Sequence, residues 1–143
     1  MMKKVILALA LIATPALAAT DIVMHRDPGC GCCEKWAAQV KRALGREVRV
    51  VDDRNRSSFQ RASGLPASLG SCHTAVIDGI VFEGHVPIAD MQRVLRMRPA
   101  GVRGLAVAGM PLGSAGMEVP GVQAQHYNVI SFGPSGTRVY SKH

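Results

Sequence analysis

The chain has 143 residues, with 17 Lys and Arg against 10 Asp and Glu, but only three Phe, two Tyr and one Trp. Surfaces that bind nucleic acid combine a basic stripe with aromatic side chains that stack on bases. Here the basic residues are scattered along the chain and aromatic residues are scarce, so the positive charge indicates a solvated surface and no nucleic-acid partner is expected.

The first 18 residues have the three parts of an export signal. Two lysines open it, residues 5–12 form an apolar centre, and residues 16–18 read Ala-Leu-Ala, a small-residue cleavage site. The apolar run is shorter than the roughly 20 residues that span a bilayer. We therefore expect a periplasmic protein, cleaved near Ala18 and without a stable membrane anchor, whose residues 19–143 form a single domain.

The first half of the mature chain alternates between strand-like and helix-like patterns. A strand, a helix, a second strand and a short helix are expected at residues 21–25, 30–44, 47–51 and 57–61. In the first helix, apolar residues recur at steps of three and four from Cys33 to Leu44, and Gly45 ends it. A loop over residues 65–70 then leads to Cys72.

The second half begins with a hairpin, because Asp78-Gly79 separates two β-rich runs. Pro87 opens another helix with an apolar face over residues 88–95. Residues 104–118 are rich in Gly, Met and Pro and predict little regular structure. Strands at residues 127–132 and 137–140 form a final hairpin.

This element order predicts an α/β fold of the thioredoxin-like kind, in which a βαβ unit is followed by a β-hairpin and a closing helix. The Gly/Met-rich loop and the last hairpin extend that core. Thiols of this fold stand where the first strand meets the first helix. The loop before the third strand faces the same helix terminus, so we expect Cys72 to lie beside Cys30 and Cys33.

Cys30, Cys32 and Cys33 are the strongest chemical signal in the sequence. Backbone N–H groups and the helix dipole stabilise a thiolate at a helix N-terminus, and the thiolate is the form that binds soft metals or attacks disulfides. On a helix Cys32 points roughly 100° away from Cys33, so a single tetrahedral zinc is not expected to collect all three thiols. A cluster with bridging thiolates, or a disulfide with a spare thiol, fits better.

Two purely structural interpretations of the four cysteines compete with thiolate chemistry. An exported protein commonly uses four cysteines for two structural disulfides. Against this, Cys32 and Cys33 are adjacent, and a C-x-x-C loop closes too few residues to stabilise the fold much. Cys33 would also serve as a small buried apolar residue facing Val40.

Cys72 and His73 precede the third expected strand, where typical thioredoxin-like oxidoreductases carry a cis-proline. A thiol and an imidazole in that place favour a metal site over disulfide exchange. His85 follows Gly84 at the end of the hairpin, and the sequence favours a metal ligand and a solvated residue equally at this position.

Met110 and Met117 stand in the Gly-rich loop, with no helical period around them that would make a core face. Methionine is usually a core residue. Thioether sulfur, like thiolate, selects Cu(I), so either methionine is a candidate ligand or lid.

Four motifs in this order resemble the CopG-type exported copper-resistance proteins. They are CGCC at 30–33 followed by Trp36, SCHTA at 71–75, EGHVP at 83–87, and two Gly-Met pairs within 109–118. The similarity runs from about Ile22 to Tyr140. It implies a thioredoxin-like fold and periplasmic copper bound by the four cysteines, with His or Met residues nearby.

The sequence departs from the pattern of that family at three positions. His25 stands where an aromatic residue is common, Gly29 where Thr is frequent, and Ala115 where Pro is frequent. None of these changes removes a thiol, and His25 adds a possible ligand.

The leading hypothesis is a periplasmic copper-binding protein that holds Cu(I), with more than one ion per chain, for copper resistance or copper redox handling. Its partners would be copper ions and other envelope copper-handling proteins. The candidate metal ligands are Cys30, Cys32, Cys33, Cys72, His73, His85, Met110 and Met117. The alternatives are a thiol–disulfide oxidoreductase using Cys30 and Cys33, and a zinc or iron–sulfur structural module. Whether a reaction is catalysed stays open.

Overall fold

A computed structural model describes residues 21–143, and the expected export signal lies outside the described residues. The helices are α1 (Gly31–Leu44), α2 (Arg56–Ala62) and α3 (Ile88–Met97), with a short 3-10 helix at Ala67–Leu69. The strands are β1 (Ile22–Arg26), β2 (Val48–Asp52), β3 (His73–Ile77), β4 (Ile80–Glu83), β5 (Gly104–Ala106), β6 (Asn128–Gly133) and β7 (Gly136–Lys142). No helix among residues 21–143 is both long and apolar enough to cross a membrane.

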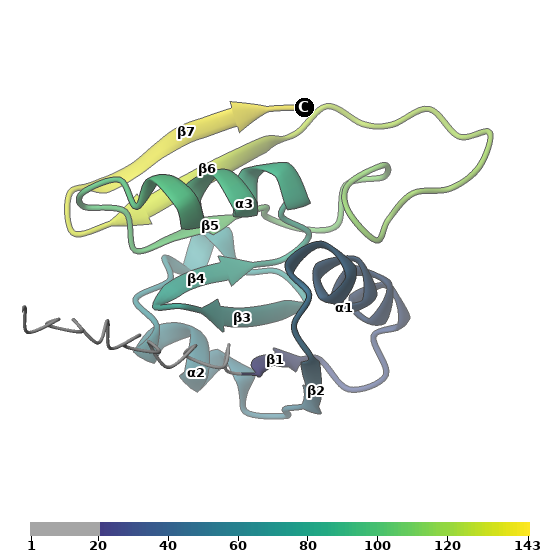
Figure 1. The fold of residues 1–143 in the computed structure, drawn as a ribbon, viewed down its shortest axis with the longest axis horizontal. Coiled ribbons are helices and arrows are strands. Elements are labelled where there is room, and N and C mark those ends of the chain that lie inside the picture. Colours follow the sequence, from purple (N-terminus) through teal and green to yellow (C-terminus); the bar gives the residue numbers. More distant parts are fainter. Residues whose placement is uncertain (1–20) are drawn as a thin grey trace, which may run out of the picture.

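All strands join one mixed sheet in the order β2-β1-β3-β4-β5-β6-β7 (Figure 1). Parallel pairs are β1 with β2 and β4 with β5, and the other neighbours are antiparallel. The βαβ unit, the β3–β4 hairpin and the closing helix α3 are therefore all present. These are the elements on which the thioredoxin-like prediction rested, and the α/β class is confirmed.

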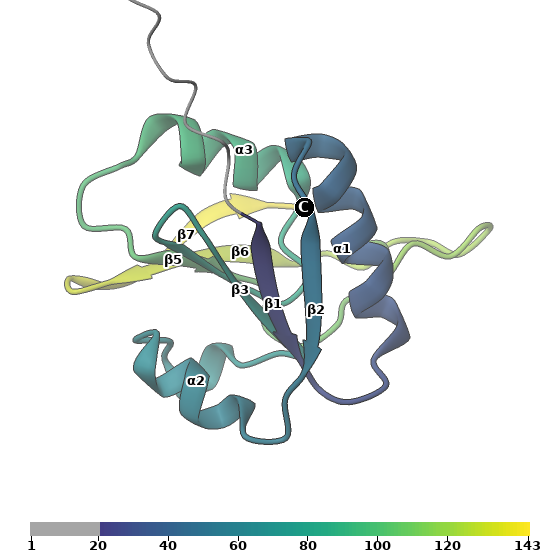
Figure 2. The same cartoon turned by 60° about the horizontal axis from the view of Figure 1, so that its bottom comes forward.

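The helices lie on opposite faces of the sheet, with α1 and α3 on one side and α2 on the other (Figure 2). Met24 of β1 is fully buried in one core with Trp36 of α1 and Met91 of α3. The next residue along β1, His25, points to the other face, where its ring stacks on Phe59 of α2 at 4.2 Å between centroids. Alternation along β1 thus separates the two layers.

The expected hairpin turn is confirmed. Asp78 and Gly79 both have positive φ, 48° and 81°, as a two-residue turn between twisted strands requires. The strands and helices expected from the sequence agree with the structure to within a few residues at each end.

The prediction of little regular structure over residues 104–118 was wrong at its start, because β5 continues the sheet there. The strand has only three residues, and its partners β4 and β6 are distant in sequence. A side chain at Gly104 would clash with the Val81 carbonyl oxygen and the Phe132 ring. Glycine is uncommon in strands, so Gly104 weakens the sequence signal for β5. The same glycine lets β4 and β6 approach on either side.

Candidate metal centre

The start of α1 carries three cysteines and is tied to the ends of β1 and β2. Arg26 donates to the Cys30 carbonyl oxygen and to Glu34 Oε1, both at 2.8 Å. Its Nε also donates to Asp52 at 2.6 Å. Hydrogen bonds between charged partners are strong, so these contacts fix the strand–helix junction that presents the thiols.

Cys30 precedes the helix as its N-cap residue, with φ −70° and ψ 98°. Its side chain therefore does not follow the helical period. The sequence analysis placed Cys30 on the helix, and that placement was wrong by one residue, whereas Cys32 and Cys33 both lie in α1 as expected. The sulfur atoms of Cys30, Cys32, Cys33 and Cys72 all lie within 4.8 Å of one another.

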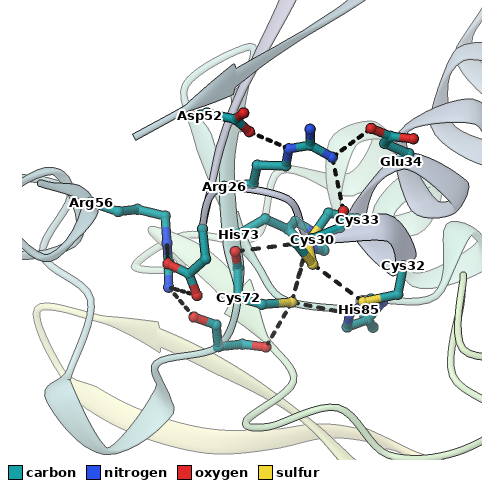
Figure 3. Close-up of a disulfide and its surroundings, with 12 residues drawn as sticks. Arg26, Cys30, Cys32, Cys33, Glu34, Asp52, Arg56, Cys72, His73 and His85 are labelled. Carbon is teal, nitrogen blue, oxygen red and sulfur yellow. Dashed lines mark hydrogen bonds and ion pairs between the residues drawn. A yellow bond between two sulfur atoms is a disulfide. The ribbon is translucent and has the colours of Figure 1, made fainter. Parts of the chain in front are cut away.

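Cys72 lies beside the start of α1, as predicted from the element order. Its sulfur is 3.4 Å from Cys33 Sγ, and its carbonyl oxygen accepts the Asp27 amide at 2.9 Å. Cys72 is buried, with 8% of the residue exposed. Cysteines from the start of α1 and from the residue before β3 therefore converge on one pocket (Figure 3).

Two of the four cysteines are joined in the structure. Cys30 and Cys33 form a disulfide, whereas Cys32 and Cys72 are free. Each free thiol lies beside one end of that disulfide, because Cys32 Sγ is 3.3 Å from Cys30 Sγ and Cys72 Sγ is 3.4 Å from Cys33 Sγ. The expectation of a disulfide with spare thiols describes this state, and reduction would free all four sulfurs.

His85 faces the same pocket with a defined ring orientation. Its Nδ1 lies 2.8 Å from the carbonyl oxygen of Ala115, which only accepts, so Nδ1 carries the proton. The unprotonated Nε2 then faces Cys72 Sγ at 3.2 Å. His85 is fully buried, and this burial lowers its pKa. Its lone pair is thus directed at the free thiol.

His73 completes a group of three potential ligands with Cys72 and His85, whose ligand atoms lie within 4.8 Å of one another. Its Nδ1 is 3.6 Å from Cys72 Sγ, and its buried Nε2 has no hydrogen-bond partner. The ring packs on Trp36 at 4.5 Å between centroids. Burial holds the pKa of His73 well below its usual range, so the ring is neutral at pH 7.

Burial also raises the pKa of the Cys72 thiol to about 11. At neutral pH and without a metal, Cys72 therefore keeps its proton and donates it toward His85 Nε2. A metal ion bound here has to displace that proton, since the thiolate is the ligand.

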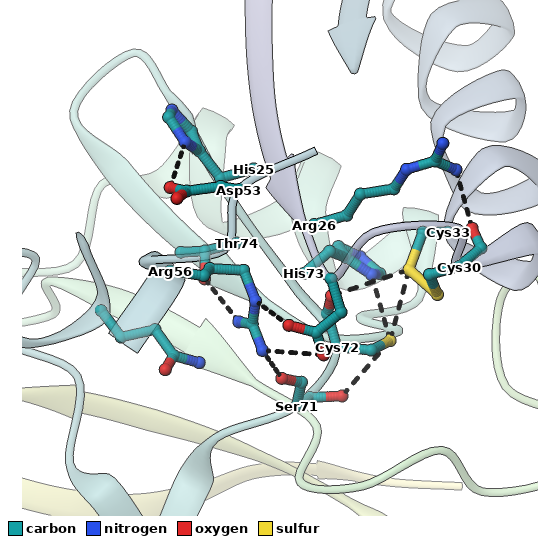
Figure 4. A network of polar contacts seen from close by, with 12 residues as sticks. His25, Arg26, Cys30, Cys33, Asp53, Arg56, Ser71, Cys72, His73 and Thr74 are labelled. Carbon is teal, nitrogen blue, oxygen red and sulfur yellow. Dashed lines mark hydrogen bonds and ion pairs between the residues drawn. A yellow bond between two sulfur atoms is a disulfide. The ribbon is translucent and has the colours of Figure 1, made fainter. Parts of the chain in front are cut away.

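A buried ion pair supports the loop that carries Cys72 (Figure 4). Arg56 donates to the Ser71 carbonyl oxygen and pairs with Glu83 at 3.2 Å and with Asp27 at 2.9 Å. Glu83 is fully buried and accepts the Ser71 amide at 2.6 Å. The network joins the β1–α1 turn to the start of β3, so it sets the distance between the two groups of cysteines.

Further donors to Glu83 complete the network on this side of the sheet. The carboxylate accepts from Gln60 Nε2 at 2.7 Å and from the Thr74 hydroxyl. Burial raises its pKa, while these hydrogen bonds and the charge of Arg56 act in the opposite direction. Sequence reasoning missed this network because neither the period of α2 nor that of β4 marks a buried charge.

The two methionines of the Gly-rich loop have different surroundings. Met117 lines a groove with Cys32, and the adjacent Gly116 lies against α1. A Cβ at Gly116 would stand 2.8 Å from the Trp36 amide nitrogen and 2.9 Å from the Cys32 carbonyl oxygen. Met110 is 52% exposed and lies outside that groove.

His25 does not add a ligand to this site. Its Nδ1 pairs with Asp53 Oδ2 at 2.9 Å, and its ring stacks on Phe59 on the opposite face of the sheet. Among residues 21–143, the Cys and His groups close enough to share an ion do not include it.

We predict that the metal-free protein loses stability as the pH falls from 7 to 5. The folded-state pKa values of His73 and His85 lie below their unfolded values, so the unfolded chain binds more protons in this range. Each histidine then lowers the free energy of unfolding by up to about 1.4 kcal/mol per pH unit below roughly pH 6.5. Urea unfolding at several pH values measures this slope.

A His73→Phe variant should have a shallower slope, and His126→Ala, an exposed control, should not. Equal slopes in all three proteins would refute the prediction.

The chain matches one family model and is similar to two solved structures. A family model described as a protein of unknown function, DUF411, matches residues 69–117. A solved structure named Copper resistance protein copG, Form 1, is 39% identical, with a TM-score of 0.78, and the match covers 88% of this chain and 98% of that one. Form 2 is 42% identical, with a TM-score of 0.76, covering 86% and 97%. No curated protein matches the chain at a significant level.

Proposed function

Because this chain belongs to the CopG-type copper-resistance family, we propose that it is a copper-binding protein of the cell envelope that holds Cu(I) through clustered thiolates. The observation that carries the proposal is the convergence of four cysteine sulfurs within 4.8 Å. They come from two segments far apart in sequence, and ion pairs support both segments, Arg26 with Asp52 at the first and the buried Arg56 with Glu83 at the second.

The donor set favours Cu(I) over harder cations. Thiolate and imidazole donors suit copper, and soft sulfur in particular selects Cu(I). Four sulfurs offer more ligation than a single Cu(I) ion takes, so bridging thiolates and more than one ion per chain are expected. Carboxylates, which suit Mg²⁺ and Ca²⁺, are absent from the groups among residues 21–143 that could share an ion.

Among the other candidates, His85 is the best-supported ligand, because the Ala115 carbonyl fixes its ring and leaves Nε2 free. His73 is the next, through the nitrogen that faces Cys72. We propose Met117 rather than Met110 as the thioether donor, since Met117 lies beside Cys32 at the open side of the pocket. Cys32 is also more exposed than Cys33 and Cys72, so ions enter past it.

Copper handling outside the cytoplasm is part of the proposal. The basic start, apolar centre and Ala-Leu-Ala motif within residues 1–18 support export and cleavage near Ala18. Residues 19–143 would then be the mature protein, acting in copper resistance or copper redox handling in the periplasm.

A second candidate function is thiol–disulfide exchange, which the Cys30–Cys33 disulfide favours. That function needs only the C-x-x-C pair, so Cys32 and Cys72 would be dispensable. The protein also lacks a cis peptide bond within residues 21–143, whereas typical thioredoxin-like oxidoreductases carry a cis-proline before the third strand.

An anaerobic Cu(I) titration of the mature protein tests the copper proposal. We expect more than one copper per chain in the fully reduced protein, and fewer in the disulfide form, because the disulfide removes two thiolates. Native mass spectrometry counts the ions. One copper or fewer on the reduced protein would rule out a cluster, and a colourless complex with one zinc in preference to copper would support the structural-zinc alternative.

A further inference from the structure

We propose that the disulfide form has its own metal-binding mode, in which Cys72, His73 and His85 hold a single Cu(II) ion. The proposal deepens the proposed copper function, because it uses the same pocket for the other oxidation state of copper. It does not require the four-thiolate Cu(I) cluster to form.

The Cys30–Cys33 disulfide divides the pocket into two sets of donors. A disulfide sulfur carries no thiolate, so the cluster loses two of its four ligands when Cys30 and Cys33 pair. Cys72, His73 and His85 do not take part in the disulfide, and their ligand atoms stay within 4.8 Å of one another in this state. The structure thus contains a complete three-ligand group in its oxidised form.

The spacing of these ligand atoms suits one metal ion. Bonds of about 2.0–2.3 Å to nitrogen and sulfur place two ligands of a trigonal or tetrahedral metal roughly 3.5–3.8 Å apart. Cys72 Sγ lies 3.2 Å from His85 Nε2 and 3.6 Å from His73 Nδ1. Shifts of a few tenths of an ångström therefore bring these two sulfur–nitrogen distances into range, and the ligand nitrogens of His73 and His85 lie within 4.8 Å of each other.

The surroundings of the two histidines also fit ligands. A metal-bound histidine usually donates its other ring N–H to a carbonyl or carboxylate, and His85 Nδ1 already faces the Ala115 carbonyl oxygen. His73 is fully buried, and Nδ1 is the ring nitrogen that faces Cys72 Sγ, at 3.6 Å. Ligation through Nδ1 leaves the ring proton on Nε2, which has no hydrogen-bond partner. Of the two histidines, His85 therefore has the more complete ligand environment.

The donor chemistry changes with the disulfide. Clustered thiolates favour Cu(I), whereas two imidazoles and one thiolate in a trigonal arrangement are the donor set of blue-copper sites, which also hold Cu(II). Closing the disulfide therefore converts a sulfur-rich pocket into one suited to Cu(II). The oxidation state of the Cys30–Cys33 pair would select the oxidation state of the bound copper.

One side reaction has to be blocked before the proposal is tested. Two Cu(II) ions can each take one electron from a pair of thiols, which release two protons and join as a disulfide while both ions become Cu(I). In the oxidised protein Cys32 and Cys72 are free thiols close enough to react in this way. A Cys32→Ser variant leaves Cys72 without a thiol partner in its own chain among residues 21–143.

The experiment adds one equivalent of Cu(II) to the disulfide form of the C32S variant. We expect one bound copper per chain, an intense visible absorption band from thiolate-to-Cu(II) charge transfer, and an EPR signal from a single Cu(II). As a second route, the oxidised wild type can be alkylated at the more accessible Cys32 while native, because Cys72 is nearly buried. This route applies even if C32S folds poorly.

Matched variants identify the ligands. In the C32S background, Cys72→Ser should abolish the charge-transfer band, and His85→Ala should remove it or shift it. His126→Ala changes an exposed histidine outside the pocket and should leave the band unaltered. Circular dichroism and thermal unfolding of each metal-free variant establish that it is folded.

Two outcomes separate this inference from the proposed function. If the oxidised protein gives only weak Cu(II) colour that persists in the Cys72→Ser variant, the Cu(II) site is refuted. Uptake of more than one Cu(I) by the reduced wild type would still support the cluster in that case. If the band appears but reduced protein takes up no Cu(I), the cluster fails and the Cu(II) site stands.

Discussion

Replacement of Cys72 by Ala is expected to lower the Cu(I) content of the reduced protein from more than one ion per chain to one or fewer. Cys72 is the one sulfur of the group that does not come from the CGCC segment at the start of α1. It also contacts both Cys33 and His85, at 3.4 and 3.2 Å. Its loss removes the donor that joins the CGCC thiols to the imidazoles.

Anaerobic titration with ions counted by mass measures this effect. Met110→Leu is the matched control, because it removes a half-exposed sulfur atom outside the pocket and should bind as many ions as wild type. The substitution at Cys72 removes only one atom from the core, so thermal unfolding of the metal-free variant should stay close to wild type. A Cys72→Ala protein that binds a full complement of Cu(I) would show that the CGCC segment alone holds the metal.

The position of Cys72 was predictable because it depends only on element order. A βαβ unit and a following hairpin place the start of β3 beside the start of α1, and register pairs Arg26 at the end of β1 with His73. Local patterns are enough for that argument: alternation in the strands, the 3.6 period in α1, and Asp78-Gly79 in the hairpin.

The details that sequence reasoning missed depend on non-local contacts. The strand β5 exists because Gly104 lets Val81 and Phe132 approach, which no local period encodes. The N-cap position of Cys30, one residue before the helix, decides whether its sulfur meets that of Cys32, yet helix ends are the least certain part of a sequence-based assignment. His25 is engaged by Asp53 through a hydrogen-bond contact of 2.9 Å between β1 and the residue that follows β2.

The two methionines illustrate the same limit. Met110 and Met117 occupy similar Gly-Met contexts, so the sequence ranks them equally. Close contact of Gly116 with the backbone of α1 brings the segment that carries Met117 to the pocket, whereas Met110 stays half exposed. Gly109 and Gly116 both have positive φ, 69° and 83°, so only the contact of Gly116 with α1 separates the two contexts.

Substitution of Arg56 by Met is expected to destabilise the metal-free protein by about 3–5 kcal/mol, because it leaves the Glu83 carboxylate buried without its cation. Arg56 also holds Asp27 and the Ser71 carbonyl oxygen, so the loop that carries Cys72 loses a donor as well. Urea unfolding at neutral pH measures the change. Arg54→Met, at an exposed arginine two residues away, is the control and should change the stability little.

A double variant separates the buried charge from the lost packing. Glu83→Gln removes the charge but keeps a side-chain carbonyl that accepts from the Ser71 amide or from Gln60. If an unpaired carboxylate causes the instability, Arg56→Met combined with Glu83→Gln should be more stable than Arg56→Met alone. Strictly additive losses would instead show that Arg56 acts through its contacts with Asp27 and Ser71. In either case the reduced double variant should bind Cu(I) less tightly, because the segment that sets the Cys72–Cys33 distance of 3.4 Å has lost its anchor.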